Sequence, residues 1–292
     1  MARRVTQVTV CAVMALIVGC GGGSDADTTA KKSAAPTSAP SGGEAETTDF
    51  TLDVNGHKIY MECRGSGSPT IVYIHGTPGQ SRSAAQIPEA LDDRHRYCAY
   101  DRPNGEGISD PVDGPLTGKD AVADLHALLA AAHVPGPYVL LGASRGGLLA
   151  DMYAATYPDD VDGMVLLDAL LPNDLISELR YIPKAQRELK PNVWKHDPEQ
   201  YDLLTTYRQA RALQGNEPSI PVTYIGTKRI ELTPSWPRKT ISAAFRKNQR
   251  DFVARFSPGR LIIVDTPHYM EPVIPARIAR EVKRVIANST EG

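Results

Sequence analysis

The stretch Tyr138-Val-Leu-Leu-Gly142-Ala143-Ser144-Arg145-Gly146-Gly147 decides the fold of this chain. It opens as a compact apolar run typical of a buried strand, turns at the pattern Gly-x-Ser-x-Gly, and continues into helix-like sequence. A serine hydroxyl is a useful nucleophile only where a tight turn presents it free of bulky neighbours, and Gly142 and Gly146 supply that room. The positive end of the helix that follows also points at the serine. We therefore interpret Ser144 as a nucleophile.

The same alternation of short apolar runs and amphipathic stretches continues from Phe50 onward. We expect strands at residues 51–54, 57–63, 70–74, 97–100, 138–141, 164–167, 222–225 and 261–264. Asn55-Gly56 supplies the positive φ angles of a hairpin turn between the first two strands. Apolar residues at helical spacing predict helices over 121–133, 148–157 and 278–286. This layout predicts an α/β fold with a mostly parallel, eight-stranded sheet and helices on both faces.

Residues 171–220 interrupt this rhythm, because they are rich in charge and hold scattered leucines where short helices would place them. Ligands bind at the carboxyl edge of an open α/β sheet, so we interpret this segment as a small helical lid over that edge. The other interpretation is a surface excursion with no role toward substrate. Together with the insertion, residues 49–292 have the usual length of one domain. A net charge of −2, from 32 basic and 34 acidic residues, gives no reason to expect nucleic acid as a ligand.

The first 48 residues have the composition of an export segment and a tether. Arg3 and Arg4 precede the apolar run 5–18, which is the layout of a secretory signal and is short for a bilayer span. The run ends in Ile17-Val18-Gly19-Cys20, which resembles the bacterial lipobox and implies lipidation of Cys20. We expect a signal peptide over 1–19 and a flexible tether over 20–48, since that stretch has too little apolar surface to fold. The expected location is the bacterial cell envelope, anchored by lipid to the outer face of the cytoplasmic membrane, or the medium after secretion.

Cysteine usage is consistent with export. If Cys11 is removed with the signal and Cys20 carries lipid, Cys63 and Cys98 remain, and an even remainder in an oxidising compartment suggests one disulfide. Two buried free thiols are the alternative.

A second motif, His75-Gly76-Thr77-Pro78-Gly79, directly follows the strand at 70–74. With the serine motif, it resembles the α/β-hydrolase family over nearly the whole chain past the tether. The resemblance implies an oxyanion hole made by the backbone N–H groups of Thr77 and Arg145. It also implies that the second and fourth strands are neighbours, which would bring Cys63 beside Cys98.

The base and the acid must come from later in the chain. His268 follows the last strand, and Pro275 and Ile278 stand at the offsets that the family shows between its catalytic histidine and its final helix. The acid must lie between serine and histidine in chain order. The family usually places it just past the strand at 222–225, where this chain offers only Glu231. Asp168, at the end of the strand at 164–167, is the alternative, and we favour it.

A serine nucleophile points to acyl transfer to water, because the dehalogenases and epoxide hydrolases of this family carry aspartate there. We expect a carboxylesterase-like hydrolase acting on a small-molecule acyl ester through a Ser-His-Asp/Glu triad. An exported peptidase of the proline-iminopeptidase type is the alternative, and an idle surface binding protein on the same scaffold is a third reading. The side chain of Arg145 either meets a substrate carboxylate or pairs with an acid of the lid. No residue spacing suggests a metal or an organic cofactor, and the oligomeric state stays open.

Overall fold

The computed structural model describes residues 47–91, 94–184, 187, 193–232 and 234–289. It contains one eight-stranded sheet, in the order β1-β2-β4-β3-β5-β6-β7-β8. Strands β1 and β2 form an antiparallel hairpin, β2 is antiparallel to β4, and all pairs from β4 to β8 are parallel. The strands are β1 (Thr47–Val54), β2 (His57–Arg64), β3 (Thr70–Ile74), β4 (Tyr97–Tyr100), β5 (Tyr138–Ala143), β6 (Val161–Leu167), β7 (Val222–Thr227) and β8 (Gly259–Val264). The predicted α/β fold and its mostly parallel sheet are confirmed.

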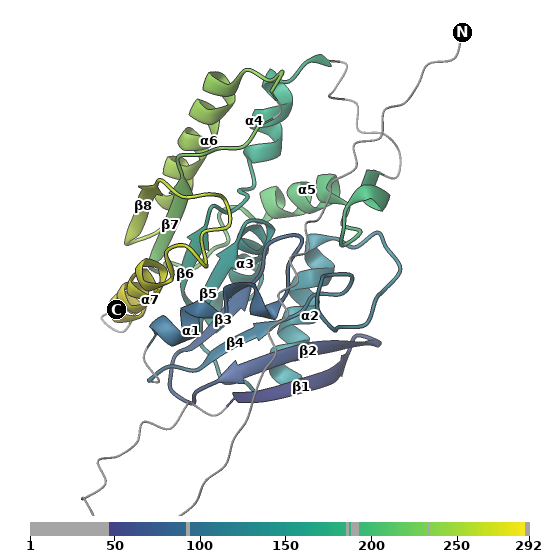
Figure 1. Cartoon of the computed structure of the whole chain (residues 1–292), viewed down its shortest axis with the longest axis vertical. Helices are drawn as coiled ribbons and strands as arrows, with labels where there is room; N and C mark the ends of the chain where they lie inside the picture. Colours follow the sequence, from purple (N-terminus) through teal and green to yellow (C-terminus); the bar gives the residue numbers. More distant parts are fainter. Residues whose placement is uncertain (1–46, 92–93, 185–186, 188–192, 233, 290–292) are drawn as a thin grey trace, which may run out of the picture. The chain divides into compact units, whose positions relative to one another are not determined.

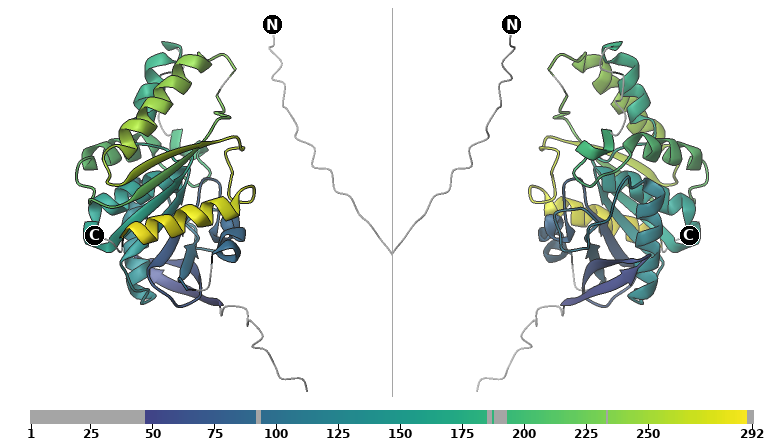
Figure 2. Two further views of the ribbon diagram at one scale, coloured as in Figure 1. Left: turned by 90° about the vertical axis from the view of Figure 1, so that its left-hand side faces the viewer. Right: turned by 90° about the vertical axis from the view of Figure 1, so that its right-hand side faces the viewer.

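Helices cover both faces of this sheet, as Figure 2 shows from two sides. They are α1 (Gln86–Ala90), α2 (Gly118–Ala131), α3 (Arg145–Thr156), α4 (Asp174–Tyr181), α5 (Leu203–Leu213), α6 (Arg238–Val253) and α7 (Pro275–Ser289). Side chains of α1 and α7, such as Ile87 and Val282, pack on one face of the sheet. Side chains of α2 and α3, such as Leu125 and Leu149, pack on the other. Every strand from β3 to β6 is buried on both sides, which explains why these strands read as unbroken apolar runs.

The predicted insertion forms α4 and α5, and α4 lies beside α6 (Figure 1). Helix α6 is missing from the sequence-based expectations, because only Ile241, Gln249, Phe252 and Val253 are buried along it and, apart from Phe245, the other positions are polar or small. Asn248 of α6 donates hydrogen bonds to Asp174 and Ser177 of α4, at 2.8 and 3.0 Å. Helices α4 and α6 therefore pack as a pair, although they belong to two separate segments of the chain.

The edge hairpin is held to the parallel strands by a disulfide. Cys63 of β2 stands directly opposite Cys98 of β4, and the two sulfurs are bonded.

Strand β1 starts at Thr47, four residues before the expected start, because the sheet extends into exposed polar residues that show no apolar alternation.

The expected signal peptide, the lipidation site Cys20 and the tether up to residue 46 lie outside the described residues. Within the described ranges, no helix is both long and apolar enough to cross a membrane.

Candidate active site

Ser144 occupies the sharp turn between β5 and α3, with φ 50° and ψ −119°. A serine in this region of positive φ is strained, and such strain is characteristic of functional turns. The turn closes because its glycines have no Cβ: one on Gly142 would meet the Cα of Gly147 at 2.6 Å, and one on Gly146 would meet the carbonyl oxygen of Ile74 at 2.0 Å. The sequence motif therefore folds into the turn that it predicts.

The loop after β3 lies against this serine. A Cβ on Gly76 would come within 3.3 Å of the Ser144 Cβ. In the described residues, the backbone N–H groups of Thr77 and Arg145 donate to no protein acceptor. Arg145 is the first residue of α3, where backbone N–H groups have no partner inside the helix. Thr77 follows Gly76 and Arg145 follows Ser144, so the two donors without acceptors belong to the two turns that meet at the serine, the segments in which the sequence predicts an oxyanion hole.

His268 follows β8 and contacts Asp168, which follows β6. Its Nδ1 lies 2.7 Å from Asp168 Oδ2, while Asp168 Oδ1 accepts a hydrogen bond from the Thr227 N–H at 3.1 Å. The hydrogen bond with Asp168 raises the pKa of His268 above its ordinary value, although partial burial works in the opposite direction. With Nδ1 donating to the carboxylate, Nε2 is left as the proton acceptor of the ring.

The other candidate acid, Glu231, makes no hydrogen bond to His268 in the described structure. It is exposed on the loop after β7 and acts on the histidine only through its charge, which adds a small contribution to the raised pKa. The structure therefore pairs His268 with Asp168, the acid that the sequence favoured, and places Glu231 in the pocket wall.

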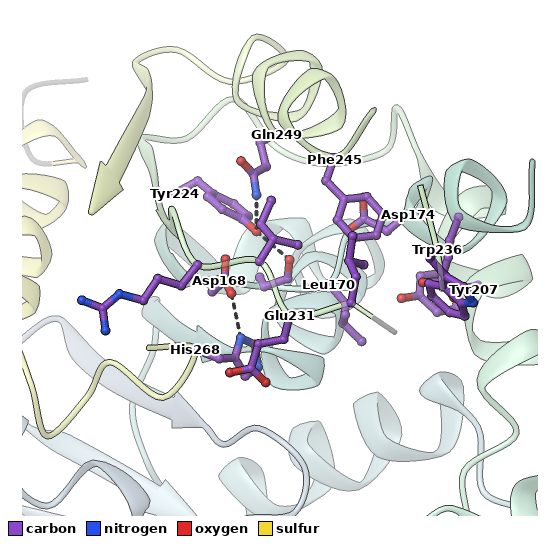
Figure 3. A pocket seen from close by; sticks show the side chains of 15 residues that line it. Asp168, Leu170, Asp174, Tyr207, Tyr224, Glu231, Trp236, Phe245, Gln249 and His268 are labelled. Carbon is purple, nitrogen blue, oxygen red and sulfur yellow. Dashed lines mark hydrogen bonds and ion pairs between the residues drawn. The ribbon is translucent and has the colours of Figure 1, made fainter. Parts of the chain in front are cut away.

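A cavity of about 510 Å³ opens along the Asp168 and His268 side of this site (Figure 3). Its walls come from α4, α5, α6, the segment after β6 and the loop after β7, and the insertion contributes Asp174, Glu178 and Tyr207. Burial raises the pKa of Asp174 to about 7, and burial also raises the pKa of Glu178. The aromatic side chains that line the cavity are Tyr207, Tyr224, Trp236 and Phe245.

Charges in this cavity are unevenly balanced. Arg229 is the one arginine or lysine among its lining residues, and its Nε donates to Asp265 outside the cavity at 2.7 Å. Asp174 accepts hydrogen bonds from Asn248 and from the Leu171 N–H, whereas the Glu178 carboxylate has no hydrogen-bond or ion-pair partner among the described residues. The cavity lining therefore combines aromatic rings with more carboxyl groups than basic side chains.

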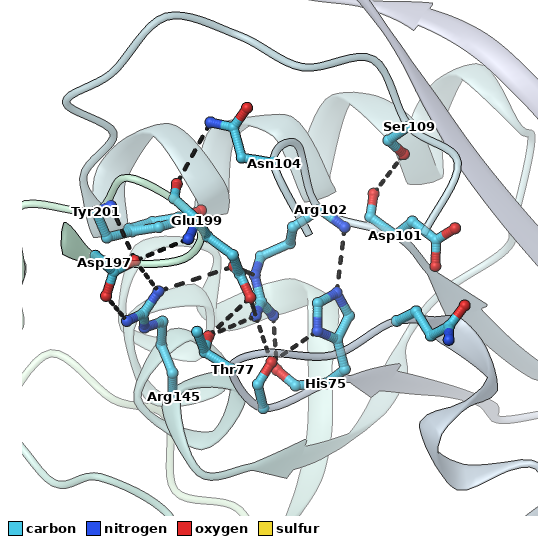
Figure 4. A network of polar contacts seen from close by, with 12 residues as sticks. His75, Thr77, Asp101, Arg102, Asn104, Ser109, Arg145, Asp197, Glu199 and Tyr201 are labelled. Atoms are coloured by element: carbon cyan, nitrogen blue, oxygen red, sulfur yellow. Dashed lines mark hydrogen bonds and ion pairs between the residues drawn. The ribbon is translucent and has the colours of Figure 1, made fainter. Parts of the chain in front are cut away.

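A buried network of charges connects the loop after β3 to Arg102 and to the insertion (Figure 4). Arg102 pairs with Glu199 at 2.7 Å, with both side chains at most 1% exposed. Arg145 pairs with Asp197, so its side chain meets an acid of the insertion, as one of the two sequence readings proposed. Arg102 is the second residue after β4, and no local pattern of the sequence marks Glu199.

The described structure contains no hydrogen bond between the Ser144 hydroxyl and His268, and Ser144 does not line the 510 Å³ cavity. Such bonds in unliganded enzymes often tighten only when substrate is bound. Within the described ranges, no three His, Cys, Asp or Glu side chains converge in a way that could hold a metal ion.

Comparison with known proteins agrees with this architecture. The family model for the α/β hydrolase fold matches residues 69–204. An uncharacterized protein of Bacillus subtilis, YqjL, is 23% identical over 77% of this chain and 89% of its own length. A pimeloyl-[acyl-carrier protein] methyl ester esterase of Chromobacterium violaceum is 37% identical over 37% of this chain and 40% of its own length. A proline iminopeptidase of Lactobacillus helveticus is 27% identical over 62% of this chain and 61% of its own length.

The chain thus spans less than two thirds of the esterase and of the peptidase. Among solved structures, a haloalkane dehalogenase variant from Bradyrhizobium elkanii superposes with a TM-score of 0.64 at 16% identity, covering 85% of this chain and 99% of its own. The strand order, the match to the family model over residues 69–204 and the structural neighbours show that the chain has the α/β-hydrolase fold.

Proposed function

We propose that this protein is a serine hydrolase that cleaves an acyl ester outside the cytoplasm through an acyl-enzyme on Ser144. The observation that carries the proposal is the arrangement around this serine, which stands in a strained turn against the loop after β3, while the backbone N–H groups of Thr77 and Arg145 have no acceptor among the described residues. The His268–Asp168 pair stands at the same edge of the sheet, because Asp168 follows β6 and Ser144 follows its parallel neighbour β5.

In the proposed reaction, His268 Nε2 takes the hydroxyl proton as Ser144 attacks the carbonyl carbon. The N–H groups of Thr77 and Arg145 stabilise the negative oxygen that develops, and Asp168 holds the imidazolium. His268 then returns the proton to the leaving alcohol, and the acyl group stays on the serine. A water molecule then gives a proton to His268 and attacks the acyl carbon. As the bond to the serine oxygen breaks, His268 returns the proton to that oxygen, which releases the acid and restores the free serine.

One observation favours a second candidate, an aminopeptidase-like activity. The side chains of Glu178 and Glu231 line the cavity without a cationic partner among the described residues, and an ammonium group of a substrate would supply one. The aromatic walls would also suit a cation. The charges of the insertion are of both signs, yet the charged side chains that it contributes to the cavity lining are the carboxylates Asp174 and Glu178 of α4.

The deciding experiment treats the folded part of the chain, residues 47–292, with a fluorophosphonate probe and compares p-nitrophenyl acyl esters with aminoacyl p-nitroanilides. We expect labelling that Ser144→Ala abolishes, and a higher kcat/KM on the esters. A higher kcat/KM on the anilides that drops in Glu178→Gln would replace the ester proposal by the peptidase. A well-folded wild type that neither labels nor turns over any substrate would leave only the reading as a binding protein.

Export and lipid anchoring through Cys20 remain part of the proposal. The cysteine pair at positions 63 and 98, which forms a disulfide in this fold, supports an oxidising compartment. The test is metabolic labelling of the full chain with an alkynyl fatty acid in a bacterial host. We expect labelling of the wild type and none of Cys20→Ala, and an unlabelled wild type would refute the anchor.

A further inference from the structure

We propose that Glu199, on the insertion, is a positioning residue. Through Arg102 and the Thr77 hydroxyl, it sets the shape of the segment 75–77 of the loop after β3, which we call the oxyanion loop. The inference rests on the proposed hydrolase function. It goes beyond that function by assigning a role in turnover to a side chain that meets neither the serine nor the histidine.

The contacts converge on one guanidinium. Arg102 donates through one terminal nitrogen to the carbonyl oxygen of His75 at 2.6 Å, and through the other to that of Gly76 at 2.7 Å. Its Nε and a terminal nitrogen also donate to the two carboxylate oxygens of Glu199, at 2.7 and 2.9 Å. The Thr77 hydroxyl donates to Glu199 at 2.8 Å. Every residue of the loop segment 75–77 is thus bound by this pair.

Through the geometry of the peptide unit, these contacts fix the direction of the Thr77 N–H, the proposed oxyanion donor. The carbonyl of Gly76 and the N–H of Thr77 belong to the same peptide plane, and this bond is not among the cis peptides of the chain. In a trans peptide the two groups point in opposite directions. When Arg102 holds the Gly76 oxygen, the Thr77 N–H must therefore point away from Arg102.

His75 contributes to the same restraint. Its Nε2 accepts the Arg102 N–H at 3.2 Å, so its proton resides on Nδ1 and is donated to the Gly76 oxygen at 2.8 Å. Burial, followed by the positive charge of Arg102, holds the pKa of His75 well below its usual value. This histidine is neutral and acts as a fixed part of the loop.

Glu199 is essential to this arrangement because Arg102 is only 1% exposed. A buried guanidinium without a counterion is strongly unfavourable, so loss of the carboxylate would release Arg102 from its place and free the Gly76 carbonyl. Asp197 orients Glu199, since its Oδ1 accepts the Glu199 N–H at 3.1 Å, and Asp197 is itself paired with Arg145. The insertion is thereby bonded to the loop segment 75–77, directly at Thr77 and through Arg102 at His75 and Gly76.

The test measures kcat and KM on a p-nitrophenyl ester for Glu199→Gln, Thr77→Val and Thr77→Ser. Glu199→Gln is expected to lower kcat about 10²-fold, the effect of misplacing one oxyanion donor, with KM nearly unchanged. Thr77→Val keeps the shape and the backbone N–H but removes the hydroxyl, and we expect it to lower kcat in the same direction by a smaller factor. Thr77→Ser, which restores the hydroxyl, should return kcat toward the wild-type value.

Glu217→Gln is the matched control, because Glu217 is a carboxylate with a side chain only 5% exposed, paired with Arg255 away from the loop. Thermal unfolding of all variants separates loss of stability from loss of rate. The proposal is overturned if Glu199→Gln lowers kcat no more than Glu217→Gln does. If Glu199→Gln does not fold, equal kcat values for Thr77→Val and Thr77→Ser overturn it. A wild type without any turnover would instead show that the proposed function itself is wrong.

Discussion

Replacing Asp168 by asparagine tests the assignment of the acid, because the two oxygens of this side chain have different partners. Oδ2 faces His268 Nδ1, and Oδ1 accepts the Thr227 N–H. An asparagine has one acceptor oxygen and cannot satisfy both donors. If its oxygen stays with Thr227, its NH₂ group faces the ring and selects the tautomer with the proton on Nε2. That tautomer cannot accept the Ser144 proton.

The expected loss of kcat can be worked out from the free-energy cost of rotating the asparagine amide so that its oxygen faces His268. The productive tautomer then leaves the Thr227 N–H facing a donor, which costs about 1–3 kcal/mol, or a factor of about 5–150 in population. Loss of the carboxylate that stabilises the imidazolium adds to this factor, and the same replacement in a serine protease lowers kcat about 10⁴-fold. We expect a loss of about 10³–10⁴-fold in kcat for Asp168→Asn.

The assay is hydrolysis of a p-nitrophenyl ester, together with the rate of fluorophosphonate labelling. Glu231→Gln serves as the matched control, since it removes a carboxylate from the same cavity without touching His268. Its kcat should stay within a small factor of the wild type. A large loss in Glu231→Gln together with a small loss in Asp168→Asn would refute the assignment.

Three further predictions follow from the same structure. Because the hydrogen bond with Asp168 raises the pKa of His268, and activity needs the neutral ring, kcat/KM should fall as pH drops through a value above 6.5; Asp168→Ala should move this acid limb to lower pH, and an unmoved limb would contradict the assignment. Replacing Cys63 and Cys98 together by serine should lower the free energy of unfolding in urea by about 4 kcal/mol, from the entropy of closing a loop of 35 residues, and a change under about 1 kcal/mol would count against this. Ser144→Gly should be more stable than Ser144→Ala by about 1–3 kcal/mol in the same assay, since glycine accepts the positive φ, and equal stabilities would argue against strain.

The strands were predictable because each is a short apolar run that ends at a turn residue. The buried strands β3 and β4 have the expected bounds. Prediction is weaker at exposed positions, as the early start of β1 at Thr47 shows, because hydrogen bonding to β2 extends the strand where side chains meet water. Helix α6 was not predicted for a related reason. Few of its positions are buried, so its sequence shows no clear helical period of apolar residues.

The site residues also differ in whether the neighbouring sequence is enough to predict them. Ser144 and His268 stand in local patterns that dictate their backbone surroundings. The choice between Asp168 and Glu231 depends on which strand end faces the histidine, which spacing alone cannot decide. The pairing of Arg102 with Glu199 joins residues 97 positions apart through a single buried contact, and no periodicity reports such a contact.

The placement of Asp168 after β6 has a consequence for how this scaffold could diversify. Under the proposed mechanism, the loop after β7 carries no group that handles the proton, yet residues 229–232 line the cavity. Substitutions there can reshape the preference for substrate while the machinery for bond cleavage stays intact. This loop is accordingly the segment to randomise in a library that seeks new substrates, and evolution had the same freedom.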